Sequence, residues 1–376
     1  MPHGIVELAA AALLSALLVA ILAIRVDPLI EGHPLFSRGD HLEYIAMSES
    51  PSAAHTPPYC CRILVPTIAR CLPFGRVDSF RALTIFFIWG TGVLIYYVLR
   101  RMGQDTFFAL IGVVLFHSLN FGTKFVLFDF WLTEPALFFF SALAVLLLIR
   151  GNGILLSVTL CLAVLGKESA LFLLPLTYTI KARRLLDRRA LMYAAAVSLA
   201  PVALFILVKG MIPASEAYSP LALFSRFGAA RLSTDLAGII RGGTLGTWGV
   251  LVLLLMLFGI GKSADLALRC LPFIVLVYLQ PLFAENVDRL LVYGFIMVIP
   301  IAVEGFRQLS RKAGLAPWMI MGAAAIPFIL VAIKSGYQSP SPEQQLLVLA
   351  VWTVLIVLVK RIRKKRMLKH SAERHT

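Results

Sequence analysis

The chain has 376 residues and a formal net charge of +15; 59% of its residues are hydrophobic and 15% are charged. This composition excludes an ordinary soluble domain and indicates a polytopic membrane protein. On the predicted topology, the loops of one side and the C-terminal tail hold 21 Lys and Arg against 6 Asp and Glu, whereas the other loops hold 14 of each. By the positive-inside rule the basic side is cytoplasmic, so the excess charge indicates contact with anionic lipid and not with nucleic acid.

The first predicted span covers residues 5–24. It is too long for a signal peptide and lacks a basic start, so we expect it to be retained. A polar loop at residues 26–81 follows on the external side. Within this loop, residues 36–47 have helical spacing, and residues 61–71 predict a second helix lying in the membrane interface.

The rest of the chain alternates between apolar segments and shorter polar ones, and both termini are expected on the cytoplasmic side. A second external loop is predicted at residues 209–246, where Glu216 and Tyr218 are among the polar residues. Residues 120–135 and 285–289 are expected to form external turns, and residues 360–376 a basic cytoplasmic tail. The further spans are predicted at residues 82–99, 106–119, 135–149, 190–208, 247–260, 267–283, 290–303, 317–333 and 346–359.

Residues 151–180 are too few for two full crossings, although both flanks carry cytoplasmic charge. Each half reaches only about 18–21 Å as a helix. Irregular backbone at such a depth is tolerated only where it lines a polar cavity. Lys167 and Glu168 are therefore predicted to face water in the outer half of the membrane. With this hairpin, the sequence predicts a single all-α integral membrane domain, residues 1–376, with about twelve transmembrane or partly spanning helices.

The ionisable residues gather at the outer ends of the spans, and mid-membrane positions are almost empty. A proton-coupled transporter usually needs acidic groups near the midplane. The longest cytoplasmic loop, residues 181–189, is too short for a nucleotide-binding domain. These features favour group transfer at the external face from a lipid-borne donor. Such a reaction needs a carboxylate to accept a proton and cations to stabilise a departing phosphate; the outer segments supply Asp40, and Arg62, Lys124, Lys167 and Arg289.

Four stretches also carry a family resemblance: GDHLEY followed by YCCRILVP, LTEPALFF, LGKESALFLLP and ENVDRLLVYGFIMVIP. Their order and common side resemble the GT-C superfamily of polyprenyl-phosphate-sugar-dependent glycosyltransferases, which includes aminoarabinose transferases, protein O-mannosyltransferases and other mannosyltransferases. The resemblance covers residues 5 to about 304 as scattered short motifs. It implies a GT-C-like bundle with interfacial helices in the first external loop.

The resemblance implies that Asp40 is the general base. It makes Arg62, Lys167 and Arg289 candidates for the donor phosphate, and other residues candidates for the sugar or acceptor. The full set with a predicted substrate-binding role is His41, Glu43, Tyr44, Tyr59, Arg62, Lys124, Asp129, Glu134, Lys167, Glu168 and Arg289. No metal ligand is assigned and no cofactor is indicated, a divalent metal remaining open.

Two departures from the family pattern bear on the acceptor. Asp40 is followed by His41, so the Asp-Glu pair of the protein O-mannosyltransferases is missing, and we expect no large C-terminal soluble domain. A lipid-linked or glycan acceptor is therefore expected in place of a protein. The expected location is the bacterial inner (plasma) membrane, with membrane lipids as partners and the site on the extracytoplasmic side.

Several alternatives remain open. A transporter or flippase of lipid-linked glycans would need a matching polar lining on the cytoplasmic half, which the sequence does not predict. A glycan ligase or polymerase with a pyrophosphate donor would use Arg residues of the second external loop. Locally, Asp40 is also a favoured helix N-cap, Lys167 and Glu168 can pair with each other, and Arg62 can extend to lipid headgroups. The cysteines have no zinc-site spacing; Cys60 or Cys61 either pairs with Cys71 or packs as an apolar side chain.

Overall fold

The computed structural model describes residues 2–361 except 216–218, 234, 285, 335, 339, 342, 349, 355–356 and 359–360. Within these residues the fold is helical, and the only β pairing is an isolated bridge between His55 and Ala214. The helices are α1 (Pro2–Ile24), α2 (His41–Glu49), α3 (Leu64–Cys71), α4 (Arg76–Arg101), α5 (Thr106–His117), α6 (Lys124–Phe128), α7 (Glu134–Arg150), α8 (Gly153–Gly166), α9 (Leu174–Thr179), α10 (Arg188–Met211), α11 (Pro220–Ser233), α12 (Leu236–Ile260), α13 (Ala264–Leu279), α14 (Val287–Leu291), α15 (Phe295–Ala313) and α16 (Pro317–Ile333), with short 3-10 helices η1 (Tyr59–Cys61), η2 (Glu168–Leu173), η3 (Gln280–Leu282) and η4 (Val292–Gly294).

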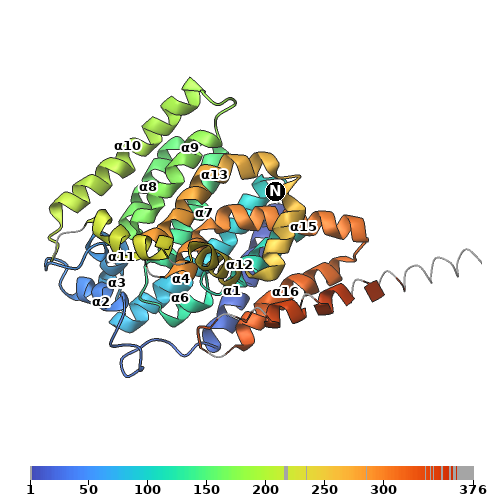
Figure 1. Ribbon diagram of the computed structural model, residues 1–376, viewed down its shortest axis with the longest axis horizontal. Coiled ribbons are helices and arrows are strands. Elements are labelled where there is room, and N and C mark those ends of the chain that lie inside the picture. The colour runs from blue at the N-terminus through green and yellow to red at the C-terminus, as the bar shows by residue number, and fades with distance from the viewer. Residues whose placement is uncertain are drawn as a thin grey trace, which may run out of the picture.

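Six of the described helical segments are long and apolar enough to cross a membrane: Gly4–Ile24, Arg76–Arg101, Arg188–Met211, Leu236–Ile260, Ala264–Leu282 and Val287–Ala313. Helix α10 lies along one edge of the molecule beside α8 and α9 (Figure 1). Its outer face exposes large apolar side chains, among them Leu199 and Ile206. An exposed apolar surface of this kind is suited to lipid and not to water. The chain is therefore an α-helical membrane protein.

Most predicted spans coincide with helices, and that at residues 317–333 has the same bounds as α16. The second external loop is different, because α11 and the first part of α12 occupy most of residues 209–246. The Asp235 side chain accepts a hydrogen bond from Gly238 N and so caps α12 well before the predicted start. The helix is kinked at Gly249, whose φ of 71° favours glycine.

Some predicted features lie outside the described residues. They are Glu216 and Tyr218 in the second loop, Glu285 in the predicted turn, and the basic tail from residue 362 on. The twelfth predicted span is described in part, and residues 346–348 and 350–354 of it are helical.

The segment at residues 120–135, which was expected to be an external turn, is instead a packed part of the fold. Nearly all of it is buried, and it contains α6. The first loop covers it: Leu29 N donates to Phe128 O at 2.8 Å, and Trp131 Nε1 donates to Leu29 O at 2.7 Å. Burial of its aromatic side chains under residues 26–36 explains why this segment is not a solvated turn.

The helical hairpin predicted at residues 151–180 is present. Helix α8 ends at Gly166, Lys167 is in an extended conformation (φ −164°, ψ 135°), and η2 and α9 return the chain. Of the tight turn predicted at residues 285–289, the part from Val287 on is helical and belongs to α14, in which Leu290 and Leu291 are buried. Both changes of direction bring charged side chains to the same end of the bundle.

All five cysteines are free, so the possible disulfide between Cys71 and Cys60 or Cys61 is not formed. Cys71 is exposed at the end of α3, whereas Cys60 is buried. Cys60 therefore packs as an apolar side chain, which was the other expectation.

Candidate active site

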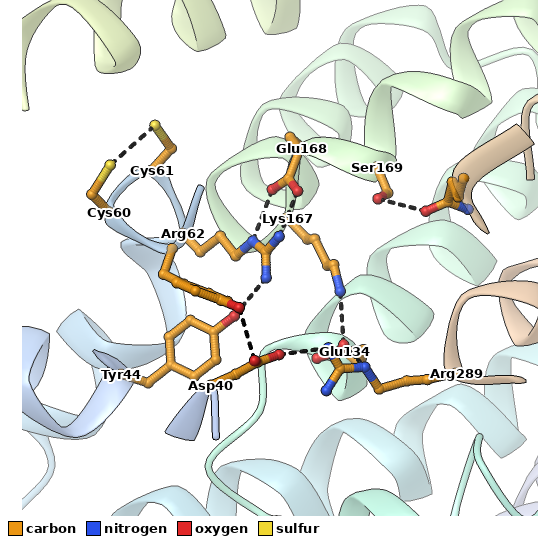
Figure 2. A network of polar contacts seen from close by, with 12 residues as sticks. Asp40, Tyr44, Cys60, Cys61, Arg62, Glu134, Lys167, Glu168, Ser169 and Arg289 are labelled. Atoms are coloured by element: carbon orange, nitrogen blue, oxygen red, sulfur yellow. Dashed lines mark hydrogen bonds and ion pairs between the residues drawn. The ribbon is translucent and has the colours of Figure 1, made fainter. Parts of the chain in front are cut away.

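Asp40 directly precedes α2, but its side chain does not cap that helix. Its Oδ1 accepts a hydrogen bond from Tyr59 OH at 2.8 Å, and its Oδ2 accepts one from Arg289 Nη2 at 2.5 Å. These two partners come from η1 and α14. Figure 2 shows the contact between Asp40 and Arg289. The helix-cap alternative is therefore excluded, and the carboxylate is directed towards distant parts of the chain.

Glu134 lies in the first turn of α7, and its side chain is only 1% exposed. Its Oε1 accepts a hydrogen bond from Lys167 Nζ at 2.7 Å and lies 3.1 Å from Arg289 Nε. Lys167 also lies over the Tyr293 ring, 5.3 Å from its centroid. Glu134 thus contacts two cations from distant parts of the chain, Lys167 of the α8–α9 hairpin and Arg289 of α14.

Arg62 follows η1 and is buried. It binds Glu168 through two hydrogen bonds, Nε to Oε2 at 2.8 Å and Nη2 to Oε1 at 2.5 Å, and its Nη1 donates to Tyr44 OH at 2.7 Å. Its guanidinium also lies 5.1 Å from the centre of the Tyr59 ring. Arg62 therefore contacts protein groups and does not extend to lipid headgroups. Glu168 pairs with Arg62 and not with Lys167.

We call Asp40, Tyr44, Tyr59, Arg62, Glu134, Lys167, Glu168 and Arg289 the outer polar network. It assembles residues from the first loop, the start of α7, the tip of the α8–α9 hairpin and α14 (Figure 2). Three carboxylates face three cations in it. The Glu168 and Asp40 side chains keep 27% and 17% of their surface exposed, so the network reaches solvent at these two carboxylates.

Burial and nearby charges determine the protonation states of Asp40 and Tyr59, the hydrogen-bonded pair of the first loop. Burial alone would raise the pKa of Asp40, but the charge of Arg289 and its hydrogen bond, with smaller contributions from Tyr59 and Arg62, lower it to about 2. Burial and the Asp40 charge raise the pKa of Tyr59 above its usual range. At neutral pH, Asp40 is thus an anion and Tyr59 a hydrogen-bond donor.

Asp129 lies beside the network, next to His41. The Asp129 Oδ2 and His41 Nδ1 atoms are 3.8 Å apart, and His41 Nε2 is 2.9 Å from Phe36 O. Burial raises the pKa of Asp129 to about 8. Asp129 is therefore mostly protonated at pH 7 and adds little charge to the network.

Two predicted site residues have other contacts. Lys124 is buried, and its ammonium group donates to the main-chain oxygens of Val331, at 2.7 Å, and Lys334. Glu43 accepts a hydrogen bond from Thr56 N at 3.2 Å and so shapes the first loop. The structure does not connect either residue to the outer polar network.

Tyr293 is a site residue that was not predicted from the sequence. It is buried against Lys167, and its hydroxyl has no hydrogen-bond partner among the residues that the structure describes. Its position four residues after Arg289 was the available signal, because residues at i and i+4 share one helix face.

Among the described residues, no group of three His, Cys, Asp or Glu side chains is placed to hold a metal ion. The network offers a carboxylate base, cations for an anion and a tyrosine donor, which together suit transfer of a group from a phosphate. Comparison with known families adds no independent evidence: no protein-family model matches the chain, and no curated protein has a significantly similar sequence.

Proposed function

We propose that this protein is a GT-C-type glycosyltransferase with a bundle of about twelve transmembrane or partly spanning helices. It moves a sugar from a polyprenyl-phosphate-linked donor to a lipid-linked or glycan acceptor. The reaction takes place on the extracytoplasmic side of the bacterial inner membrane, with both termini cytoplasmic. The observation that carries this proposal is the Asp40 carboxylate, held by a tyrosine and by Arg289 beside the Lys167–Glu134 pair.

In this reaction the acceptor hydroxyl oxygen attacks the anomeric carbon of the donor sugar, with inversion. Its proton passes to the Asp40 carboxylate. The bond between the anomeric carbon and the phosphate oxygen breaks, and its electron pair leaves with polyprenyl phosphate. The charge on this phosphate changes from −1 to −2. Cations held in a partly dry site stabilise that growing charge, and this favours the transition state.

The residues that stabilise the leaving phosphate are Arg289 and Lys167, which share one oxygen of Glu134. Arg62 has an indirect role: its ring contact with Tyr59 and its hydrogen bond to Tyr44 order the first loop, which carries Asp40. Glu168 is the more exposed carboxylate and is available for the hydroxyls of the sugar or acceptor.

One observation favours the alternative, a transporter or flippase of lipid-linked glycans. A cavity of about 540 Å³ lies at the opposite end of α1 and α4, lined by Glu7, Tyr96, Arg100, Arg101 and Gln104, among others. No polar lining was expected there from the sequence. Between the two ends, however, the described helices pack tightly: Ser15 and His117 are fully buried, with Ser15 Oγ and His117 Nε2 2.9 Å apart. The glycan ligase has less support, since Arg231 of α11 donates to the backbone oxygens of Pro281 and Ala284.

The proposal is tested by measuring which chemical class of sugar donor the protein consumes. The purified protein in nanodiscs is given three labelled donors with the same sugar: linked to polyprenyl phosphate, linked to polyprenyl pyrophosphate, and linked to a nucleotide. A panel of sugars and glycolipid acceptors is screened. We expect consumption of the monophosphate-linked donor alone. Consumption of the pyrophosphate-linked donor would support the ligase, and absence of cleavage with every sugar would contradict the proposal.

A further inference from the structure

The charges of the outer polar network are balanced. Asp40, Glu134 and Glu168 face Arg62, Lys167 and Arg289, and every cation already has a carboxylate partner. A phosphodiester would bring a further negative charge next to side chains such as Glu134 and Lys167, which are 1% and 2% exposed. Burying an unpaired charge is costly. A donor phosphate can therefore bind these cations only if one carboxylate gives up its partner.

The three ion pairs differ in how readily they can open. Glu134 is buried and contacts two cations through one oxygen. Glu168 is more exposed, but its two hydrogen bonds to Arg62 form a bidentate pair, which is the stronger geometry. Asp40 is bound to Arg289 through Nη2 alone, at the partly exposed edge of the network. The Asp40–Arg289 pair is the one most easily replaced.

Arg289 is also placed to keep its position when that pair opens. Its Nε stays 3.1 Å from Glu134 Oε1 without a well-formed hydrogen bond, so it has donor capacity left over. Lys167 Nζ lies 2.7 Å from the same oxygen. Arg289 Nε and Lys167 Nζ are thus no more than 5.8 Å apart, the sum of these two distances. A phosphate bound to Arg289 would lie within reach of Lys167.

We propose that the phosphate of the donor displaces Asp40 from Arg289, so that the catalytic carboxylate is released only when a donor is bound. Glu134 acts as a positioning residue that holds Arg289 and Lys167 together during the exchange. This inference rests on the proposed function and specifies how its site is regulated.

The exchange would change the strength of the base. Asp40 is faced by Arg289 of α14, by Tyr59 of η1 and by Arg62, and it lies near the carboxyl groups of Asp129 and Glu134. In the resting protein its pKa of about 2 makes it a weak base. Once Arg289 turns to the phosphate, the main group lowering this pKa is lost and a new negative charge is added. Asp40 then binds the acceptor proton more strongly, while Tyr59 still orients it.

Infrared difference spectroscopy of the protein in nanodiscs tests the exchange without catalysis. Polyprenyl phosphate, the expected leaving product, is the probe, and Asp40→Asn identifies the carboxylate band. Without the probe, we expect Asp40 to remain ionised down to pH 3.5 or so. With the probe, we expect the pKa of Asp40 to rise by at least about one pH unit, so that the carboxylate begins to be protonated above this pH. Binding of the probe without a change in Asp40 would overturn the exchange and leave the proposed function standing. Failure of the probe to bind would overturn both.

Kinetics give a second test. The pH dependence of kcat/KM reports the free enzyme, and that of kcat reports the complex. We expect the acidic limb of kcat to lie at higher pH than that of kcat/KM in the wild type. Arg289→Gln should bring the two limbs together, because Asp40 is then released before the donor binds. Arg241→Gln, at an exposed position on α12, is the matched control and should keep them apart. Coincident limbs in the wild type would contradict the exchange.

Discussion

Asp40 and Arg289 are 249 positions apart in the sequence, yet Asp40 Oδ2 and Arg289 Nη2 lie 2.5 Å from each other. The contact joins the end of the first external loop to α14, and through Glu134 it extends to the α8–α9 hairpin. Every charged side chain of the outer polar network has an opposite partner, which explains how so many charges are buried together there.

Glu134→Gln should strongly destabilise the protein. The change leaves buried Lys167 without its carboxylate partner and leaves Arg289 with Asp40 alone. Removing one partner of a buried pair typically costs about 3–5 kcal/mol. Thermal unfolding in detergent checks this. The matched control is Asp265→Asn, which breaks the exposed pair with Arg269 on α13 and should change the free energy of unfolding by less than about 1 kcal/mol. Equal effects of the two substitutions would show that the Glu134 contacts contribute no more than a surface pair.

Lys124→Met should lower the stability of the protein without affecting catalysis. The Lys124 ammonium binds backbone oxygens after α16 and does not touch the outer polar network, so its loss should lower Tm but leave the donor KM of folded protein unchanged. Lys167→Met should raise the donor KM and lower kcat together, because the charge on the leaving group grows in the transition state. The donor KM and kcat of both variants, measured per folded molecule, check these two expectations. A raised donor KM in the Lys124 variant would place that residue in the site after all.

Asp129 should make the protein less stable as pH rises. Its pKa is raised to about 8 in the folded state from 3.8 in the unfolded state, so its stabilising contribution is complete below pH 3.8 and is lost as pH rises towards 8. Asp129→Asn stays neutral and should flatten the fall in Tm between pH 4 and pH 8. Asp40 has the opposite sign, because its pKa is lowered: its contribution is lost only as pH falls from about 4 to 2. An unchanged pH dependence in Asp129→Asn would mean that this side chain is solvated.

Side-specific labelling should show residues 26–81 outside and residues 181–189 inside. After the five native cysteines are replaced, single cysteines are introduced at two exposed positions, Leu35 and Leu185. A membrane-impermeant maleimide should label the first in intact cells and the second only after permeabilisation. The reverse pattern would place the outer polar network on the cytoplasmic side and exclude the proposed orientation.

The sequence predicted those parts of the fold that depend on local composition. Apolar length identified α1, α4, α10 and α16, and the shortage of residues identified the hairpin whose tip carries Lys167. It did not predict the burial of residues 120–135, because their polar and aromatic composition is typical of a turn and the covering by the first loop is not a local property. It also placed the start of α12 too late, since the Asp235 cap and the Gly249 kink have no hydrophobic signal.

The candidate site was predicted as a set of residues but not as a set of pairs. The common side of the motifs brought Asp40, Arg62, Lys167 and Arg289 together, as the structure does. Which carboxylate each cation contacts depends on helix rotation and on the fold of the first loop, and neither can be read from spacing. Lys167 was thus expected to pair with Glu168 or to face water, whereas it pairs with Glu134 and is 2% exposed.

The most direct test of the central claim asks whether the donor is cleaved at the Asp40 site or carried intact. Purified wild type and Asp40→Asn are placed in liposomes with a labelled polyprenyl-phosphate sugar and a glycolipid acceptor, and both free polyprenyl phosphate and donor movement between leaflets are measured. The exposed loop variant Asp27→Asn is the control. We predict release of polyprenyl phosphate by the wild type and the control, and a 10²–10⁴-fold slower release by Asp40→Asn, roughly the effect of removing a general base. Movement of uncleaved donor between leaflets without release, or near-normal release by folded Asp40→Asn, would contradict the claim.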